Sequence, residues 1–275
     1  MSNRGGESVA PNQAVEIACL SDPGQAREHN EDSLACVPEL GIVVLADGMG
    51  GHNAGEVASG MATSLISAGL ARGWTAQALE GLDRDAAQAL SRAQLQQQLD
   101  AANLAIYQKA ESEPDCEQMG STVLACLFHH DFVSVAHVGD SRLYRFRNEA
   151  LEQVTRDHSL LQEQIDAGLL RKEDAHLSAN KNLLTRAFGV DPDEPGEIHS
   201  HDTAPGDIYL LCSDGLYGMV GDADIEMGIS IMRDNLGLAA RQLVQAANDA
   251  GGHDNISVVL VRIAGGQVSA QNEFF

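Results

Sequence analysis

Positive charge is scarce in this chain. Its 275 residues include 17 lysines and arginines against 40 aspartates and glutamates, so the formal net charge is −23. Nucleic acids and anionic membrane surfaces bind clusters of basic residues, so neither is expected as a main partner of so acidic a chain. Most of the excess carboxylates are expected to lie hydrated on the surface, but some are available to bind metal ions.

Long apolar runs and paired cysteines are also lacking. No apolar run approaches the roughly 20 residues that span a bilayer, and the N-terminal run Met-Ser-Asn-Arg-Gly-Gly-Glu-Ser has no hydrophobic signal core. We therefore expect a cytoplasmic protein. The five cysteines include no Cys-x-x-Cys pair, and three of them (Cys19, Cys126 and Cys212) lie in apolar, strand-like runs. Buried, reduced thiols explain all five better than disulfides or a zinc site.

The chain has enough apolar residues for one sizeable core. Hydrophobic residues make up 44% of it, and its length suits one large α/β domain better than two small ones. Residues 1–12 are polar and contain glycine and proline, as is typical of a flexible leader, and residues 264–275 indicate a loose tail. No repeat or strong linker interrupts residues 13–263, which are expected to form a single domain.

Hydrophobic periodicity predicts strands that cluster in hairpin-like pairs, with helices between and after them. A strict alternation of strand and helix is absent, which favours antiparallel sheets covered by helices over a doubly wound parallel sheet. The three residues His129-His130-Asp131 are short enough for a hairpin turn. The predicted strands are Gln13–Leu20, Gly41–Ala46, Thr122–Phe128, Phe132–Val138, Arg142–Arg147, Ile208–Cys212 and Ile256–Ile263. The predicted helices are Ala54–Ala71, Asp85–Ala110, Leu160–Leu170 and Leu238–Ala250.

Acidic residues recur beside glycines, at the ends of strand-like runs or just before them. Carboxylates and carbonyls without cysteine or histidine are the ligands that Mg²⁺ and Mn²⁺ prefer. Two such ions about 3.5–4 Å apart can hold a bridging hydroxide and clamp a phosphoryl group. A lone Asp-Gly is more often a turn, and the spacing leaves the pairing of ligands to ions open. The sites are Glu31-Asp32, Asp47-Gly48, Asp140, Asp214-Gly215 and Asp254-Asn255.

Seven short motifs, in order, resemble the motif series of the bacterial metal-dependent protein phosphatases (the PPM or type 2C family). The resemblance covers roughly residues 14–263 and implies an α+β four-layer sandwich, in which two antiparallel β-sheets pack face to face and are flanked by helices on both sides. It also implies hydrolysis of phosphoserine and phosphothreonine in proteins by a metal-bridging hydroxide, which reverses a Ser/Thr kinase. The motifs are Arg27–Asp32, Ala46–His52, Gly120–Thr122, Val138–Arg142, Leu184–Gly189, Cys212–Leu216 and Asp254–Ser257.

The same resemblance implies which residues hold two core Mn²⁺ or Mg²⁺ ions. Asp47 would bridge both ions, and the carbonyl of Gly48 would bind one of them. Asp214 and Asp254 would complete the shell of one ion.

The remaining ligands follow from the resemblance less directly. Glu31 or Asp32 would serve the other core ion, directly or through water, and the bacterial pattern points to Asp32. Asp140 and Asp214 would share a third, weaker ion.

Two further residues and one segment are implied to handle the substrate. Arg27 would hold the substrate phosphate, a task suited to a guanidinium fork. His52 is the candidate general acid that protonates the departing serine or threonine oxygen, although it could instead contact water only. Residues 157–189 lie where bacterial members carry a flap, and the alternative is a plain surface excursion.

Two other functions compete with phosphoprotein hydrolysis. A pseudophosphatase would keep the fold as a binding module and lack a ligand carboxylate, but here every ligand position of the motif series is acidic. A phosphatase acting on a small phosphate ester would keep the chemistry and change the substrate, which the sequence does not exclude. The expected partners are phosphoprotein substrates together with a Ser/Thr kinase and its targets.

Overall fold

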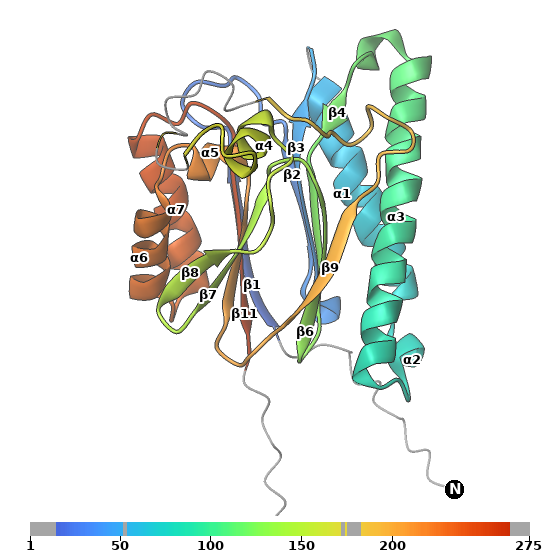
Figure 1. Ribbon diagram of the computed structural model, residues 1–275, viewed down its shortest axis with the longest axis vertical. Coiled ribbons are helices and arrows are strands. Elements are labelled where there is room, and N and C mark those ends of the chain that lie inside the picture. The colour runs from blue at the N-terminus through green and yellow to red at the C-terminus, as the bar shows by residue number, and fades with distance from the viewer. Residues whose placement is uncertain (1–14, 52–53, 172–173, 175–182, 265–275) are drawn as a thin grey trace, which may run out of the picture.

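The computed structural model describes residues 15–51, 54–171, 174 and 183–264, and two antiparallel β-sheets face each other at its centre (Figure 1). The first sheet, in spatial order, consists of β1 (Val15–Asp22), β11 (Ile256–Ile263), β10 (Ile208–Cys212), β7 (Arg142–Arg147) and β8 (Ala150–Gln153). The second consists of β2 (Asp32–Val37), β3 (Ile42–Met49), β5 (Val123–Phe128), β6 (Phe132–Val138) and β9 (Glu197–Asp202), with β4 (Gly120–Ser121) paired to β3.

Helices cover the outer face of each sheet, which gives four layers (Figure 1). The second sheet is covered by α1 (Ala54–Gly73) and α3 (Arg84–Ser112), and the first by α6 (Asp222–Met232) and α7 (Leu236–Asp249). None of the described helices is long and apolar enough to cross a membrane. The shorter helices are α2 (Ala76–Leu79), α4 (Leu160–Asp166), α5 (Asp214–Tyr217) and the 3₁₀ turns Pro38–Leu40 and Pro114–Cys116. The predicted α+β four-layer sandwich is confirmed.

The side chains of β3 show why a strand in the middle of a sandwich has no polar face. Because successive side chains point to opposite faces of a sheet, Ile42 and Val44 pack under α1 and α3, whereas Val43 and Leu45 pack between the two sheets. Both faces of β3 are therefore shielded from water, and its sequence is apolar at consecutive positions. This double burial explains why β3 was readily predicted from its sequence.

Several elements differ from the prediction. The strands β2, β8 and β9 were not predicted, because their sequences are polar or only half-buried and give a weak hydrophobic pattern. The helix α6 was not predicted either, because its exposed Met227 and Ile231 obscure the apolar stripe that Ile225 and Ile229 form. The strand β3 continues to Met49, past the predicted end at Ala46, and α4 ends at Asp166 rather than Leu170. The predicted leader at 1–12 and nearly all of the tail at 264–275 lie outside the described residues.

All five cysteines are free thiols, as predicted, but they are not all buried. Cys116, Cys126 and Cys212 are buried, whereas Cys36 is half-buried and Cys19 is exposed. Cys19 lies on β1, which pairs on one flank with β11 and is the edge strand of the first sheet among the described residues. The prediction of five buried thiols was therefore wrong for Cys19 and only partly right for Cys36.

Candidate active site

Strand pairing and strand ends bring the predicted carboxylates together from both sheets. In the second sheet, Asp32 begins β2 and lies directly opposite Asp47 of β3 in the antiparallel register. In the first sheet, Asp214 follows the end of β10 and Asp254 precedes β11, while Asp140 lies in the turn that leads from β6 to β7. The site therefore exists only where the two sheets face each other at one end of the sandwich.

The pKa values of these carboxyl groups record how crowded they are. Withdrawal from bulk water raises the pKa of Asp47 well above its ordinary value, and the charges of Asp32, Asp214, Asp140 and Asp254 raise it further. Burial, with neighbouring carboxylates, raises the pKa of Asp214 to about 8. Burial likewise raises the pKa values of Asp32 and Asp140 to about 6. Like charges held this close require a counter-charge, which a divalent cation supplies.

The two oxygens of Asp32 have different surroundings. Its Oδ2 accepts a hydrogen bond of 2.8 Å from the hydroxyl of Ser213, whose oxygen in turn accepts one of 3.0 Å from the backbone N–H of Ser257. Its Oδ1 is buried and has no hydrogen-bond partner among the described residues. A buried carboxylate oxygen without a partner is costly, and its position beside Asp47 is suited to a cation. The residues present therefore fit a site for a hard metal ion.

Gly48 lies where backbones approach too closely for a side chain. Its N–H donates to the carbonyl oxygen of Glu31 at 3.1 Å, which fixes the chain just before β2 against β3. The start of α1 also passes close to Gly48, and Gly55 in that helix leaves the necessary space because it too lacks a side chain. A glycine at this position keeps the backbone beside Asp47 accessible.

Replacing Gly48 by alanine is expected to destabilise the protein by on the order of 1–3 kcal/mol. The added Cβ would lie 2.1 Å from the carbonyl oxygen of Gly55 and 2.7 Å from that of Glu31, so the backbone would have to shift. Urea unfolding would measure the loss. Gly51→Ala is the matched control, because a Cβ there meets no atom of the described residues within 4 Å. Equal unfolding midpoints for the two variants would contradict this packing.

Asp140 is held by residues to which the sequence analysis gave no role. The hydroxyl of Tyr217 donates to the Asp140 carbonyl oxygen at 3.0 Å. The guanidinium of Arg142 lies 3.6 Å from the centre of the Tyr217 ring and forms an ion pair of 2.8 Å with the buried Asp157. The only sequence signal for this cluster was that Arg142 ends the motif Val138–Arg142 and that Asp157 begins the predicted flap.

Asn255 has a similar supporting role beside Asp254. Its side-chain amide donates to the carbonyl oxygens of Pro23 and His29, and its Oδ1 accepts from the backbone N–H of Glu31. It thereby joins the segment before β2 to the segment before β11. Its place next to a predicted ligand was the available signal, but the contacts could not be read from the sequence.

Arg27 lies at the edge of the same site. Its Nη2 donates to Oδ2 of Asp254 at 2.8 Å, while about half of its side chain (52%) remains exposed. Arg27, Asp140, Asp214 and Asp254 line a cavity of about 450 Å³. An exposed guanidinium beside a carboxylate cluster, at the rim of a cavity, can reach an anion that enters it.

Not every predicted site residue can be placed. His52 lies outside the described residues, as does part of the predicted flap at 157–189. The beginning of that segment is fixed by two contacts. The backbone N–H of His158 donates to the carbonyl of Gly139 at 2.9 Å, and Asp157 forms its ion pair with Arg142. The structure thus brings together Arg27 and the five aspartates Asp32, Asp47, Asp140, Asp214 and Asp254.

Comparison with known proteins connects this arrangement to a family. The chain is 38% identical over 244 residues to the serine/threonine phosphatase stp of Listeria innocua, covering 88% of this chain and 93% of that one. It is also 38% identical to the serine/threonine protein phosphatase PstP of Mycobacterium tuberculosis, but spans only 45% of that longer protein. The crystal structure of the M. tuberculosis phosphatase PstP/Ppp matches with a TM-score of 0.79 at 35% identity, covering 92% of this chain and all of that one.

A second solved structure, the catalytic domain of PstP in complex with two manganese ions, matches with a TM-score of 0.76 at 35% identity. It covers 92% of this chain and 99% of that one. Residues 25–245 match the family described as protein phosphatase 2C. The chain therefore belongs to the protein phosphatase 2C family, as its motif series predicted.

Proposed function

We propose that this chain is a metal-dependent protein phosphatase that hydrolyses phosphoserine and phosphothreonine in proteins. The observation that carries the proposal is the cluster of five aspartates drawn from both sheets. Three of them, Asp140, Asp214 and Asp254, line a cavity that Arg27 also lines. Relatives named as serine/threonine phosphatases support the activity, and the relative solved with two manganese ions supports its dependence on metal.

The carboxylates would divide the ligand positions among them. Asp47 lies opposite Asp32, and its charge interacts with Asp214 and Asp254, so it is suited to bridge two ions. The unpartnered Oδ1 of Asp32 favours this residue over Glu31 as the direct ligand. When bound, Mn²⁺ or Mg²⁺ supplies the positive charge that activates a water molecule and stabilises the phosphoryl group.

Arg27 and His52 would handle the substrate. The guanidinium of Arg27 is held by Asp254 through one nitrogen, and its other N–H groups, which donate to no other described residue, would bind phosphate oxygens at the cavity rim. His52 stays a prediction as the general acid that gives a proton to the departing serine or threonine oxygen. The residues from 157 to 189 would select substrates as a flap.

A third, weaker ion is proposed at Asp140 and Asp214. Asp140 and Asp214 line the same cavity, and burial together with the charge of Asp140 raises the pKa of Asp214, which supports a cation shared between the two carboxylates. The turn that carries Asp140 is held by Tyr217 and the Arg142–Asp157 ion pair, which do not depend on the Asp140 carboxylate.

Asp140→Ala is therefore expected to lower kcat by roughly 10–100-fold at saturating Mn²⁺ while two tight metal sites persist. Calorimetry would count the ions, and steady-state kinetics would give kcat. Full activity in a slightly less stable protein would instead indicate that Asp140 only caps its turn. Loss of the two tight sites as well would mean that Asp140 belongs to the core pair.

The activity itself is tested with matched substrates. We expect Mn²⁺-dependent hydrolysis of a chromogenic aryl phosphate and of phosphoserine and phosphothreonine peptides, with kcat/KM higher for peptides than for small metabolic phosphate esters. Preference for a small ester would point to the alternative substrate class. Absence of any Mn²⁺-dependent turnover, with phosphopeptide binding retained, would indicate a pseudophosphatase. The proposal includes a cytoplasmic location and a Ser/Thr kinase that phosphorylates the same proteins.

A further inference from the structure

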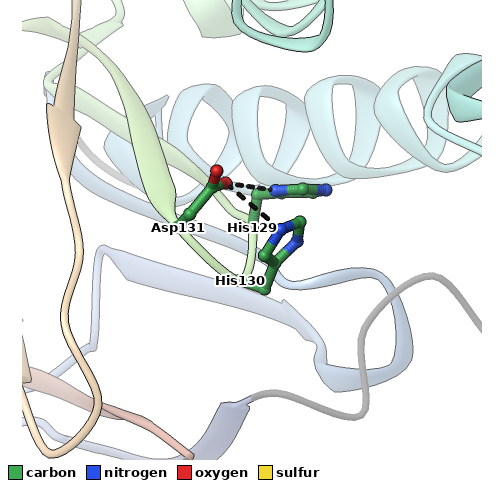
Figure 2. A group of neighbouring side chains, drawn as sticks. All are labelled: His129, His130 and Asp131. Carbon is green, nitrogen blue, oxygen red and sulfur yellow. Dashed lines mark hydrogen bonds and ion pairs between the residues drawn. The ribbon is translucent and has the colours of Figure 1, made fainter. Parts of the chain in front are cut away.

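A group of potential metal ligands lies far from the carboxylate cluster. His129, His130 and Asp131 form the turn between β5 and β6, and their side chains gather on one side of it (Figure 2). The residue before β5, Thr122, donates its N–H to the carbonyl of Asp47, whereas His129 follows the other end of the strand. Six residues of strand separate the two ends by about 20 Å, so this turn is independent of the catalytic centre.

We propose that this turn binds a divalent transition-metal ion of the Zn²⁺ type through His129, His130 and Asp131. Nδ1 of His129 lies 2.8 Å from Oδ1 of Asp131, and Nε2 of His130 lies 3.7 Å from the same oxygen. One ligand atom from each residue lies within 4.8 Å of the others. Ligands about 2.0–2.1 Å from a tetrahedral zinc ion are roughly 3.3 Å apart, so small side-chain rotations complete the site.

The packing of His129 holds its ring in the required orientation. The ring stacks on Phe132, with centroids 4.7 Å apart, and Trp74 packs edge-on against it at 6.3 Å. The side chain of His130, by contrast, is 68% exposed and gives an ion access from solvent.

The turn and its carboxylate are also fixed by neighbours. The N–H of Thr203 donates to the carbonyl oxygen of Asp131 at 3.1 Å. The Nε of Arg84 lies 3.4 Å from Oδ2 of Asp131, which is the oxygen that does not contact the imidazoles. The carboxylate thus faces the two histidines with Oδ1 while its other oxygen is held by an outer partner, an arrangement typical of metal ligands.

The chemistry of the ligands separates this site from the catalytic one. Imidazole nitrogens favour Zn²⁺, Ni²⁺ and Cu²⁺, whereas the carboxylate cluster favours Mn²⁺ and Mg²⁺. The described residues contain a second group of potential metal ligands, which includes His158, but its geometry is less favourable. There the guanidinium of Arg186 lies 3.0 Å from Nε2 of His158, whose Nδ1 already accepts the N–H of Gly139. In that group the positively charged guanidinium of Arg186 therefore lies where a metal ion would have to bind.

Calorimetry with Zn²⁺ tests the proposal, with excess Mg²⁺ present to occupy the carboxylate cluster. The wild-type protein should bind one Zn²⁺ and gain melting temperature. His130→Ala should weaken zinc binding by at least roughly tenfold and abolish the gain, with its zinc-free melting temperature and its Mn²⁺-dependent hydrolysis unchanged, because this side chain is mostly exposed.

His253→Ala is the matched control, because His253 is an exposed histidine that lines the catalytic cavity. It should bind zinc like the wild type. Zinc binding that is unchanged in His130→Ala, or that is lost in His253→Ala instead, would overturn the proposal and place the ion in the catalytic cavity. Failure to detect any zinc binding would overturn it as well. None of the zinc-binding outcomes depends on whether the chain hydrolyses phosphoproteins.

Discussion

Asp47→Asn is expected to lower Mn²⁺-dependent hydrolysis by on the order of 10³-fold or more while making the metal-free protein more stable. Both effects have the same origin. Asp47 lies at the centre of the carboxylate cluster, where its charge interacts with Asp32, Asp140, Asp214 and Asp254. The substitution removes the proposed bridging ligand, and it also removes a charge that is costly to bury when no cation is present.

Two measurements on the same variant check this prediction. Steady-state turnover at saturating Mn²⁺ gives the loss of activity, and thermal melting in EDTA gives the change in stability. Asp249→Asn, a neutralised carboxylate at the exposed end of α7, is the matched control and should change neither. Near-native turnover would reject the bridging role, and a lower melting temperature in EDTA would mean that the Asp47 carboxylate is satisfied without metal.

The metal-free protein is expected to lose stability as the pH rises from about 4 to 8. The pKa of Asp214 is raised to about 8, and those of Asp32 and Asp140 to about 6, from an unfolded value of 3.8. Because the folded state holds these protons more tightly than the unfolded state, their stabilisation is complete below about pH 4. It is lost progressively as the pH passes through 6 and then 8.

Mn²⁺ should remove this pH dependence, since the bound cations take the place of the protons. Melting curves in EDTA and in Mn²⁺, recorded across the same pH range, would show the difference. Asp214→Asn should flatten the EDTA curve between pH 6 and 8, which separates the effect of the cluster from that of other titrating groups. A metal-free protein whose stability is constant over this range, or equal with and without Mn²⁺, would contradict a preformed metal site.

The parts of the fold that the sequence predicted well are those with a local hydrophobic pattern. β3 and β10 are buried on both faces and therefore have continuous apolar runs, followed at once by Asp47 in β3 and, after Ser213, by Asp214 beyond β10. β2 begins with the polar pair Asp32 and Ser33 and is half-buried throughout, and Ile198 is the one apolar residue of β9, so neither sequence has a hydrophobic pattern that distinguishes it from a loop. Long-range pairing rather than local propensity makes these two segments strands.

The same distinction applies to the site. The motifs predicted which carboxylates would come together in the site, but they did not predict which residues would hold those carboxylates in place. The hydroxyl of Ser213 meets Asp32 across 181 positions of sequence, and that of Tyr217 meets Asp140 across 77. Such contacts follow from how the two sheets are aligned with each other, which no periodicity within a single strand can specify.

The position of β11 has a consequence for biosynthesis. This strand, residues 256–263, lies between β1 and β10 in the first sheet. While the chain is still being made, β1 lacks its neighbour and β10 lacks one of its two neighbours until residue 263 has emerged from the ribosome. Asp254 arrives in the same last stretch. The nascent polypeptide can therefore form neither a closed first sheet nor the complete cluster of five aspartates, so we expect no dephosphorylation before synthesis has passed this strand.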